Sequence, residues 1–302
     1  MKKLLLAAAV ATALSTPVAA LAQTPAAAPA SPHTFTGNLG FANDYRFRSI
    51  SQTFGKMAVQ GGFDYSHSSG FYLGTWASNV YGGNNASGLG TNYFNGNIEW
   101  DVYGGYKFEP IKDITMDVGV LTYMYPGAKY GTPTRGDYTN TELYLGASWK
   151  WFTAKYSNSL TDYFGINNGS MSPGGVAACG VDAGGGALAA GSADCAKLNA
   201  GGSKGSSYLD LGATFDIGSG FNLVAHIGKL SVKNYGLFNY TDYKLGLTKD
   251  WLGLTWGASY IANNARSTVY RTVKTEGAAP TTNTVVYDTR KPTLLFTVQK
   301  TF

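Results

Sequence analysis

Short stretches in which apolar and polar residues alternate recur along most of the chain. In one of them, Ile98, Trp100 and Val102 fall on one face, while Glu99 and Asp101 fall on the other. A period of two residues predicts a β-strand that meets apolar surroundings on one face and polar surroundings on the other. The pattern predicts twelve strands, at residues 35–47, 56–65, 70–79, 93–107, 113–125, 138–149, 151–161, 206–215, 221–231, 239–249, 252–262 and 291–302.

The connections between these predicted strands alternate between short and long. After every second strand the chain turns within about one to five residues, whereas the other gaps are longer and include residues 162–205 and 263–290. Outer-membrane barrels have an even number of strands, short periplasmic turns and longer extracellular loops. We therefore predict an all-β fold: a transmembrane antiparallel up-and-down β-barrel of about 12 strands over residues 35–302, with periplasmic N- and C-termini.

The composition agrees with β-structure in an unusual solvent. Of the 302 residues, 40 are glycine and 14% are aromatic, and only 14% are charged, against about 25% charged in ordinary soluble domains. A helical membrane protein needs several apolar runs of about 20 residues, and only one short run is present, at the N-terminus. The formal net charge of +5 is small and dispersed, so nucleic acid is not an expected partner.

The start of the chain has the features of a secretory signal peptide. Two lysines precede a short apolar stretch, residues 4–14, and a small-x-small cleavage pattern ends at Ala22. We predict that residues 1–22 are removed on export, the alternative being an uncleaved N-terminal anchor. Residues 23–34 are rich in Pro and Ala and are predicted to be a flexible lead-in. The expected location is the bacterial outer membrane, with its lipid as a partner.

The longest predicted loop, residues 162–205, contains both cysteines, Cys179 and Cys195. In an exported chain two cysteines are expected to form a disulfide, with two free thiols as the alternative. The loop is rich in small residues and has two interpretations, a constriction or lid over the barrel and a mobile outer decoration.

The chain ends at Phe302, on the same strand face as Leu294, Phe296 and Val298. Bacterial outer-membrane barrels commonly end in this way. We therefore predict that Phe302 is a C-terminal assembly signal and that the outer-membrane assembly machinery is a partner.

The charges on the polar face of the predicted strands would line the barrel interior. Because an unpaired buried charge costs several kcal/mol, these groups must pair across the lumen or face water. Twelve strands lie between eight-stranded barrels filled by side chains and sixteen-stranded barrels with aqueous channels. We predict a narrow mixed-charge channel, the alternative being a lumen plugged by ion pairs and inserted loops. The pore-lining candidates are Asp44, Arg46, Arg48, Asp64, Glu99, Asp101, Asp117, Glu142, Lys155, Asp210, His226, Asp242 and Lys244.

The first predicted strand carries a cluster of charges near its end. Asp44, Arg46 and Arg48 alternate with Tyr45 and Phe47, so we expect the charged side chains to point inward and the aromatic ones to face the lipid boundary. The arginines could screen anionic solutes at the pore mouth, or they could belong to a structural ion-pair network. Other aromatic residues expected at the lipid boundary are Tyr65, Trp149, Trp151, Phe152, Tyr243 and Trp251.

Four motifs within residues 37–80 carry a resemblance to a known family: GNLG at 37–40, DYRFR at 44–48, QGGFDY at 60–65 and GTWASNV at 74–80. The chain resembles the TorF family of proteobacterial proteins assigned as porins, also described as the Gcw_chp domain of unknown function. The resemblance implies an exported outer-membrane protein with a pore, and it transfers no substrate and no catalytic residue. Ser49 departs from the family, which usually has glycine there, so the local turn is in question.

A search for catalytic sets yields little. The three histidines are His33, His67 and His226. His67 and Ser69 have the spacing seen in barrel phospholipases, because alternate residues share a face, but both fall in a predicted short turn. We find no phosphate loop, dinucleotide fingerprint or metal-spaced His/Cys cluster. The sequence therefore predicts no enzyme, cofactor or metal site, but a channel through which small charged or polar solutes diffuse. The alternative is a closed structural or adhesin barrel acting through its loops.

Overall fold

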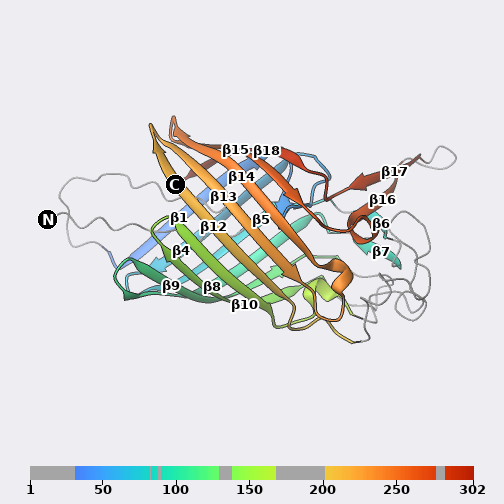
Figure 1. Ribbon diagram of the computed structural model, residues 1–302, viewed down its shortest axis with the longest axis horizontal. Coiled ribbons are helices and arrows are strands. Elements are labelled where there is room, and N and C mark those ends of the chain that lie inside the picture. Colours follow the sequence, from blue (N-terminus) through green and yellow to red (C-terminus); the bar gives the residue numbers. More distant parts are fainter. Residues whose placement is uncertain are drawn as a thin grey trace.

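In the computed structural model, described residues are 31–81, 83–87, 90–94, 96–128, 138–167, 201–276 and 283–302. Twelve strands form a closed barrel (Figure 1). In chain order they are β1 (His33–Ala42), β4 (Ala58–His67), β5 (Phe71–Asn79), β8 (Ile98–Ile111), β9 (Ile114–Met124), β10 (Asn140–Trp149), β11 (Phe152–Ser159), β12 (Ser207–Gly218), β13 (Phe221–Ser231), β14 (Tyr240–Trp251), β15 (Leu254–Asn263) and β18 (Thr293–Thr301).

All neighbouring barrel strands are antiparallel, and β1 closes the barrel by pairing with β18. The closing register runs from Asn38 opposite Thr301 to Ala42 opposite Thr297. Closure gives each strand two neighbours and leaves no open sheet edge, which is what a sheet in hydrocarbon requires. The predicted all-β fold of twelve antiparallel strands is confirmed.

Short turns gather at one end of the barrel, where β1 begins and β18 ends (Figure 1). The connections after β8, β10, β12 and β14 are two-residue turns. In Ser219–Gly220 and Leu252–Gly253 both residues have positive φ, as two-residue hairpins require to match the strand twist. The six long connections lie at the other end, which we call the loop end.

Short elements occur within the long connections. They are β2 (Arg46–Phe47), β3 (Ile50–Ser51), β6 (Gly83–Ser87), β7 (Gly90–Phe94), η1 (Tyr163–Gly165), η3 (Gly236–Phe238), α2 (Ser267–Tyr270), β16 (Arg271–Glu276) and β17 (Asn283–Asp288). The pairs β2–β3, β6–β7 and β16–β17 are separate two-stranded hairpins. Among the described residues, no helix is long and apolar enough to cross a membrane.

The predicted first strand, 35–47, is wrong at both ends. Strand β1 begins at His33, which pairs with His67, so the barrel wall starts inside the region predicted as a lead-in. The strand ends at Ala42, and Asn43 then bonds the backbone of β18, donating its backbone N–H to Phe296 O at 3.1 Å and its side-chain amide to Leu294 O at 3.1 Å. After this cap the chain leaves the wall.

The chain between β1 and β4, residues 43–57, turns into the barrel, and we call it the inward segment. Residues 44–51 are buried, whereas residues 55–57 at its end are exposed. The β2–β3 hairpin turns at Arg48 and Ser49, with φ of 46° and 64°. A positive φ favours glycine. Ser49 therefore adopts a backbone conformation that suits the glycine usually found at this position in the resembled family. Tyr45 and Phe47 are only 3% and 7% exposed, so their predicted place at the lipid boundary is wrong.

The predicted strand 93–107 is also wrong at its start. Residues 90–94 form β7, which pairs with β6 in a loop hairpin, and the barrel strand β8 begins at Ile98. It then continues to Ile111, beyond the predicted end. The apolar–polar alternation runs through both strands, so the pattern alone did not reveal that they belong to different sheets.

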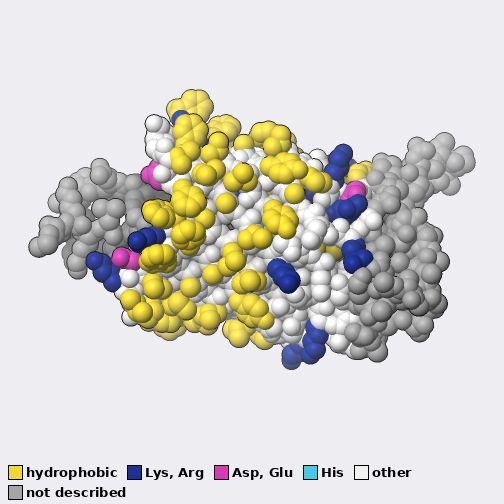
Figure 2. Space-filling model, viewed as in Figure 1, with side chains coloured by type: hydrophobic (Ala, Val, Ile, Leu, Met, Phe, Trp, Pro, Cys, Tyr) yellow, Lys and Arg dark blue, Asp and Glu magenta, His cyan; other side chains and the backbone are white. Residues whose placement is uncertain are grey.

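The outer surface of the barrel is apolar. Large hydrophobic side chains such as Phe63, Leu145 and Leu245 are 73%, 51% and 57% exposed, and Figure 2 shows hydrophobic side chains spread along the wall. Five of the aromatic residues expected at the lipid boundary, Trp149, Trp151, Phe152, Tyr243 and Trp251, are between 45% and 56% exposed. The sixth, Tyr65, is half-buried. An apolar patch of this extent is typical of a surface that meets a membrane.

Candidate functional site

All thirteen candidate lumen residues lie on the inner face of the barrel wall or on the inward segment, although many of them are far apart in sequence. Three of them, Asp64, His226 and Lys244, are half-buried. The other ten are buried: Asp44, Arg46, Arg48, Glu99, Asp101, Asp117, Glu142, Lys155, Asp210 and Asp242. The inward segment brings several of these groups into contact.

Asp44 organises the inward segment. Its Oδ1 atom accepts hydrogen bonds from Ser51 Oγ at 2.6 Å, Thr53 Oγ1 at 2.9 Å and the Gly55 backbone N–H at 3.1 Å. Its Oδ2 atom lies 2.5 Å from Arg46 Nε. These hydrogen bonds stabilise the turn, because hydrogen bonds to a charged acceptor are stronger than those between neutral groups.

Arg46 ties the inward segment to the last long connection. Its Nη1 atom donates to the backbone oxygens of Ser49, Thr289 and Lys291 at 3.2, 3.0 and 3.1 Å. With Asp44 at its Nε atom, the guanidinium spans the hairpin and the residues that precede β18. Arg46 therefore acts as a structural clamp.

Arg48 reaches across the barrel to the opposite wall. Its Nη2 atom donates to both carboxylate oxygens of Glu142 at 2.9 and 2.8 Å, Nη1 donates to Tyr163 Oη at 3.1 Å, and the guanidinium lies 4.1 Å from the ring centre of Tyr208. Burial lowers the pKa of Arg48, but Glu142 and the surrounding tyrosines raise it, and the net direction is upward. Arg46 and Arg48 are thus both engaged in ion pairs. This is the geometry of the structural ion-pair network that we gave above as the alternative to an anion filter.

Glu99 and Asp101 lie on the inner face of β8 and are both fully buried. Glu99 accepts hydrogen bonds from the hydroxyls of Tyr45 at 2.6 Å and Tyr125 at 2.7 Å. By contrast, both carboxylate oxygens of Asp101 are buried with no hydrogen-bond partner among the described residues. A buried carboxylate that accepts no hydrogen bond is costly, which sets Asp101 apart from Glu99 on the same strand.

His226 joins two carboxylates on the other side of the barrel. Its Nδ1 and Nε2 atoms lie 2.9 Å from Asp210 Oδ1 and 3.0 Å from Asp242 Oδ1. Asp242 also accepts hydrogen bonds from Tyr208 Oη and Ser49 Oγ, both at 3.0 Å. The serine contact links this group to the tip of the inward hairpin.

Tyrosines partner the carboxylates nearer the short-turn end. Tyr103 donates to Asp64 at 2.6 Å and Tyr72 donates to Asp117 at 2.7 Å. Two lysines complete the candidate set. The Lys155 ammonium lies 4.0 Å from the ring centre of Tyr144, and Lys244 is opposite His226 in the β13–β14 register.

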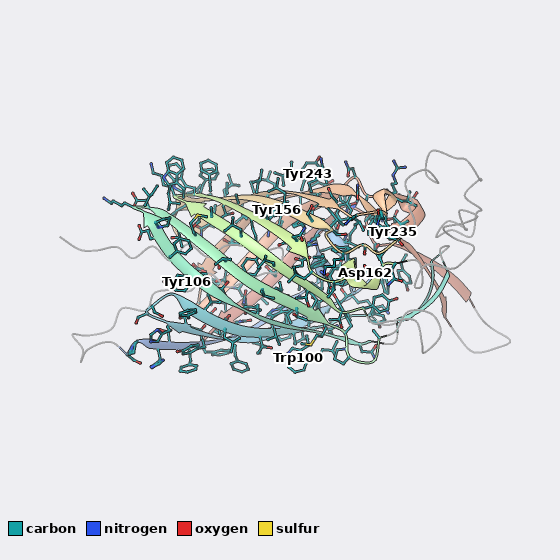
Figure 3. All side chains as sticks on the ribbon, turned by 90° about the horizontal axis from the view of Figure 1, so that it is seen from below. Trp100, Tyr106, Tyr156, Asp162, Tyr235 and Tyr243 are labelled. Atoms are coloured by element: carbon teal, nitrogen blue, oxygen red, sulfur yellow. The ribbon has the colours of Figure 1, made fainter. Side chains whose placement is uncertain are left out.

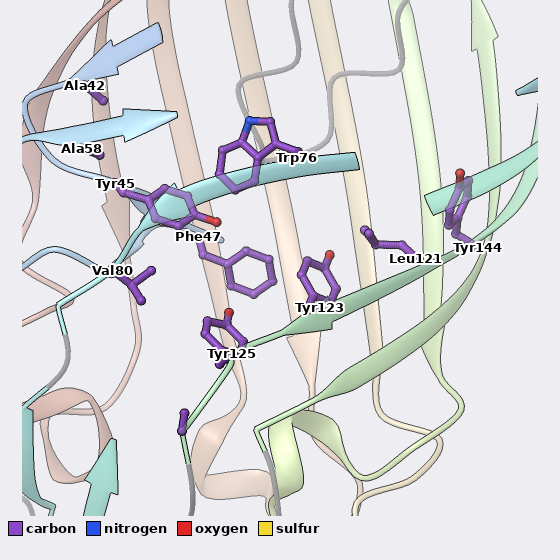
Figure 4. Close-up of a cluster of buried hydrophobic side chains, with 11 residues drawn as sticks. Ala42, Tyr45, Phe47, Ala58, Trp76, Val80, Leu121, Tyr123, Tyr125 and Tyr144 are labelled. Atoms are coloured by element: carbon purple, nitrogen blue, oxygen red, sulfur yellow. The ribbon is translucent and has the colours of Figure 1, made fainter. Parts of the chain in front are cut away.

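The tyrosines are the part of the interior that the sequence interpretation missed. Tyr45, Tyr123 and Tyr125 pack with Phe47 and Trp76 in a buried cluster inside the barrel (Figure 4). One signal for the inward turn was present, because Asp, Ser and Gly are favoured in turns and all three occur between residues 44 and 55.

Hydrogen bonds of Asp162 and Tyr235, which Figure 3 shows at the loop end, hold the base of the longest connection. Asp162 accepts from the Lys204 backbone N–H and from the Asn167 side chain, both at 3.0 Å. Tyr235 donates to Gly201 O at 2.6 Å. The predicted disulfide between Cys179 and Cys195 lies outside the described residues.

The remaining candidates lie near the short-turn end. Phe302 is 70% exposed and donates its backbone N–H to Gly37 O at 2.8 Å. His67 Nδ1 lies 2.6 Å from Ser69 Oγ in an exposed turn. Over the described ranges, no group of three or more His, Cys, Asp or Glu side chains is arranged to hold a metal ion.

Comparison with known proteins places the chain in a family. Residues 26–302 match the family described as "Bacterial protein of unknown function (Gcw_chp)", and no curated protein matches. Similar solved structures include a KdgM porin, with 7% identity over 88% of this chain and 99% of that chain at a TM-score of 0.45. A NanC porin has 12% identity over 88% and 98% at 0.43, and a Pseudomonas aeruginosa FadL homologue 11% over 90% of each chain at 0.39. The family match covers the whole barrel, and the chain belongs to the Gcw_chp family.

Proposed function

We propose that the protein is an outer-membrane channel through which small polar or charged solutes diffuse, as the TorF assignment suggests. The observation that carries this proposal is the inverted distribution of side chains. The closed barrel presents exposed apolar side chains outward, and its thirteen candidate charged or titratable side chains face inward. That arrangement is the one an outer-membrane barrel needs, with lipid outside and a polar lumen inside.

The topology also supports an orientation. We propose that residues 1–22 are cleaved on export, that the short turns and both termini are periplasmic, and that the loop end is extracellular. Phe302 then lies at the periplasmic boundary, where the assembly machinery would read it. A disulfide between Cys179 and Cys195 would shorten the free length of the longest loop.

The lumen is proposed to prefer cations. The thirteen candidates comprise eight acidic residues, four basic residues and one histidine, and both arginines are engaged in ion pairs. Rings of carboxylates favour cation passage. Asp101 is fully buried in this structure, and neither of its oxygens accepts a hydrogen bond from the described residues, so we propose it as the carboxylate that contacts a cation in the conducting state.

Planar-bilayer recording of the full chain purified from outer membranes tests this function. We expect discrete openings and a reversal potential in a KCl gradient that favours K⁺ over Cl⁻. Asp101→Asn should lower the permeability ratio about twofold, while the control Asp113→Asn, in an exposed turn, leaves it unchanged. Folded protein that produces no openings would reject the channel.

A second candidate function is a closed barrel that acts through its loops, and the inward segment favours it. In that case the wild type is silent, and Arg46→Ala with Arg48→Ala produces current because it frees the hairpin. Deletion of residues 166–204 separates the two functions further. Conductance should change if the longest loop gates a channel, and only binding to cells or surfaces should change if it is an adhesin.

A further inference from the structure

A cavity of about 250 Å³ lies at the loop end, above the inward segment. Each of the six long connections contributes to its lining. Its floor includes Phe47 and Phe54 of the inward segment, and its walls include Tyr125, Phe164 and Tyr270. The cavity is therefore formed jointly by all six long connections at the loop end.

Aromatic rings dominate this lining and pack edge to face. The ring of Phe164 lies 5.5 Å from that of Phe47 at 80° and 4.7 Å from that of Tyr163 at 83°. Tyr270 meets Phe238 and Tyr240 at 82° and 84°. Edge-to-face pairs are a favoured geometry for aromatic rings, and an additional ring can join such a cluster in the same way.

Five of the six lining tyrosines have a hydroxyl group that is already hydrogen-bonded, and among them Tyr81 accepts from Lys56 Nζ at 2.7 Å. Tyr163 Oη accepts from Arg48, Tyr240 donates to Arg48 O at 2.9 Å, Tyr270 donates to Phe238 O at 2.8 Å, and Tyr125 donates to Glu99. Burial raises the pKa of Tyr163 to about 12, so this ring stays neutral. The tyrosines therefore offer the cavity ring surface more than hydrogen-bonding groups.

Two of the lining phenylalanines have an unusual backbone. Phe164 and Phe54 have φ of 45° and 54°, in the left-handed region that bulky residues rarely adopt. Strained residues of this kind persist where the surrounding structure holds them, and they cluster at ligand clamps. Both of these residues line the cavity.

We propose that this cavity is a binding site for a small neutral aromatic compound of one or two rings. An apolar cavity of about 150 Å³ accommodates benzene, so 250 Å³ has room for a substituted or bicyclic ring. Arg48, beneath the floor, is paired with Glu142 and offers no free charge for an acid. The site depends only on the loop end and stands whether or not the lumen conducts.

The test uses the full chain in lipid nanodiscs, with indole as the probe and empty nanodiscs as a correction for lipid partitioning. Saturation-transfer NMR and calorimetric titration should show saturable binding. Phe164→Ala and Phe164→Leu remove the ring but keep a Cβ, so the backbone strain is common to all three proteins. We expect binding about tenfold weaker in both variants.

Phe215→Ala is the matched control, because Phe215 packs with Trp151 and Phe152 near the short turns. It should bind indole like the wild type. The proposal is overturned if binding does not exceed partitioning, if Phe164→Ala binds as tightly as Phe215→Ala, or if methyl glucoside binds and indole does not. Heat-modified gel mobility establishes that each variant is folded.

Discussion

At the scale of single residues, most charged side chains in the barrel interior form ion pairs or hydrogen bonds. Arg48 and Glu142 are 94 positions apart in sequence and form a two-pronged buried ion pair. Such a pair contributes little net stability compared with apolar residues, but removal of one partner is costly because the other charge remains buried. The pair therefore determines where the inward hairpin sits more than how stable the barrel is.

This argument predicts an asymmetry between single and double variants. Arg48→Met and Glu142→Leu should each destabilise the protein by about 3–5 kcal/mol, and the double variant should recover most of the loss. The free energy of unfolding by urea in lipid vesicles measures the effect. Equal losses in the single and double variants would contradict the buried pair.

At the scale of elements, strands follow local pattern and connections follow tertiary contacts. Over much of their length the barrel strands alternate outward apolar residues with inward polar or small residues, as the sequence pattern predicts. The inward segment has no such periodicity, and its path follows the bonds of Asp44 and Arg46. Small inward residues then make room for the large ones.

Gly62 illustrates this division of space. An added Cβ there would lie 2.5 Å from Thr75 O and 3.2 Å from Trp76 Cα, whereas at Gly146 the nearest atom would be 3.6 Å away. Gly62→Ala should therefore destabilise the barrel by about 1–3 kcal/mol. Gly146→Ala should be neutral or stabilising by up to about 1 kcal/mol. Urea unfolding followed by tryptophan fluorescence distinguishes them, and equal midpoints would contradict the packing argument.

The base of the longest loop is a second element with a specific support. Asp162→Ala removes the acceptor for the Lys204 backbone N–H, so exchange of that amide should accelerate about fivefold, since one hydrogen bond is worth about 1 kcal/mol. Hydrogen–deuterium exchange measures the rate. Asp216→Ala removes a similar bond to Gly218 at the opposite end and should leave Lys204 unchanged. An unaltered Lys204 rate in Asp162→Ala would show that other contacts hold the loop base.

At the scale of the whole molecule, the distribution of side chains is reversed relative to a water-soluble protein. Leu211, in the middle of β12, is 43% exposed, while Asp210 beside it is 4% exposed. Water-soluble barrels place such leucines inside. A lipid surrounding accounts for both positions at once.

The lipid surrounding predicts a depth dependence. Leu211→Arg should destabilise the protein in vesicles by about 2–4 kcal/mol, and Leu252→Arg, in a short turn, by about 0–1 kcal/mol. Both free energies come from urea unfolding of the vesicle-embedded protein. If the two substitutions cost the same, the apolar belt is not in hydrocarbon.

The candidate site shows how far sequence reasoning reaches. Alternation places Glu99, Asp101, Glu142 and Asp242 on the inner face, because successive side chains of a strand point to opposite faces, and all four are buried in the barrel. It failed for Tyr45 and Phe47, because residues that leave the barrel wall no longer follow the two-residue period of a strand. No local pattern could indicate that Tyr45 bonds Glu99.

The sequence by itself determined the twelve strands, their antiparallel order and the two contrasting ends. These follow from local periodicity and connection length, because every residue of a strand meets either lipid or lumen. Only the tertiary structure decided that the inward segment turns into the barrel, that Asp101 has no hydrogen-bond donor among the described residues and that the loops line an aromatic cavity. Those features depend on contacts between residues far apart in the chain, such as Arg48 with Glu142, which no local pattern encodes.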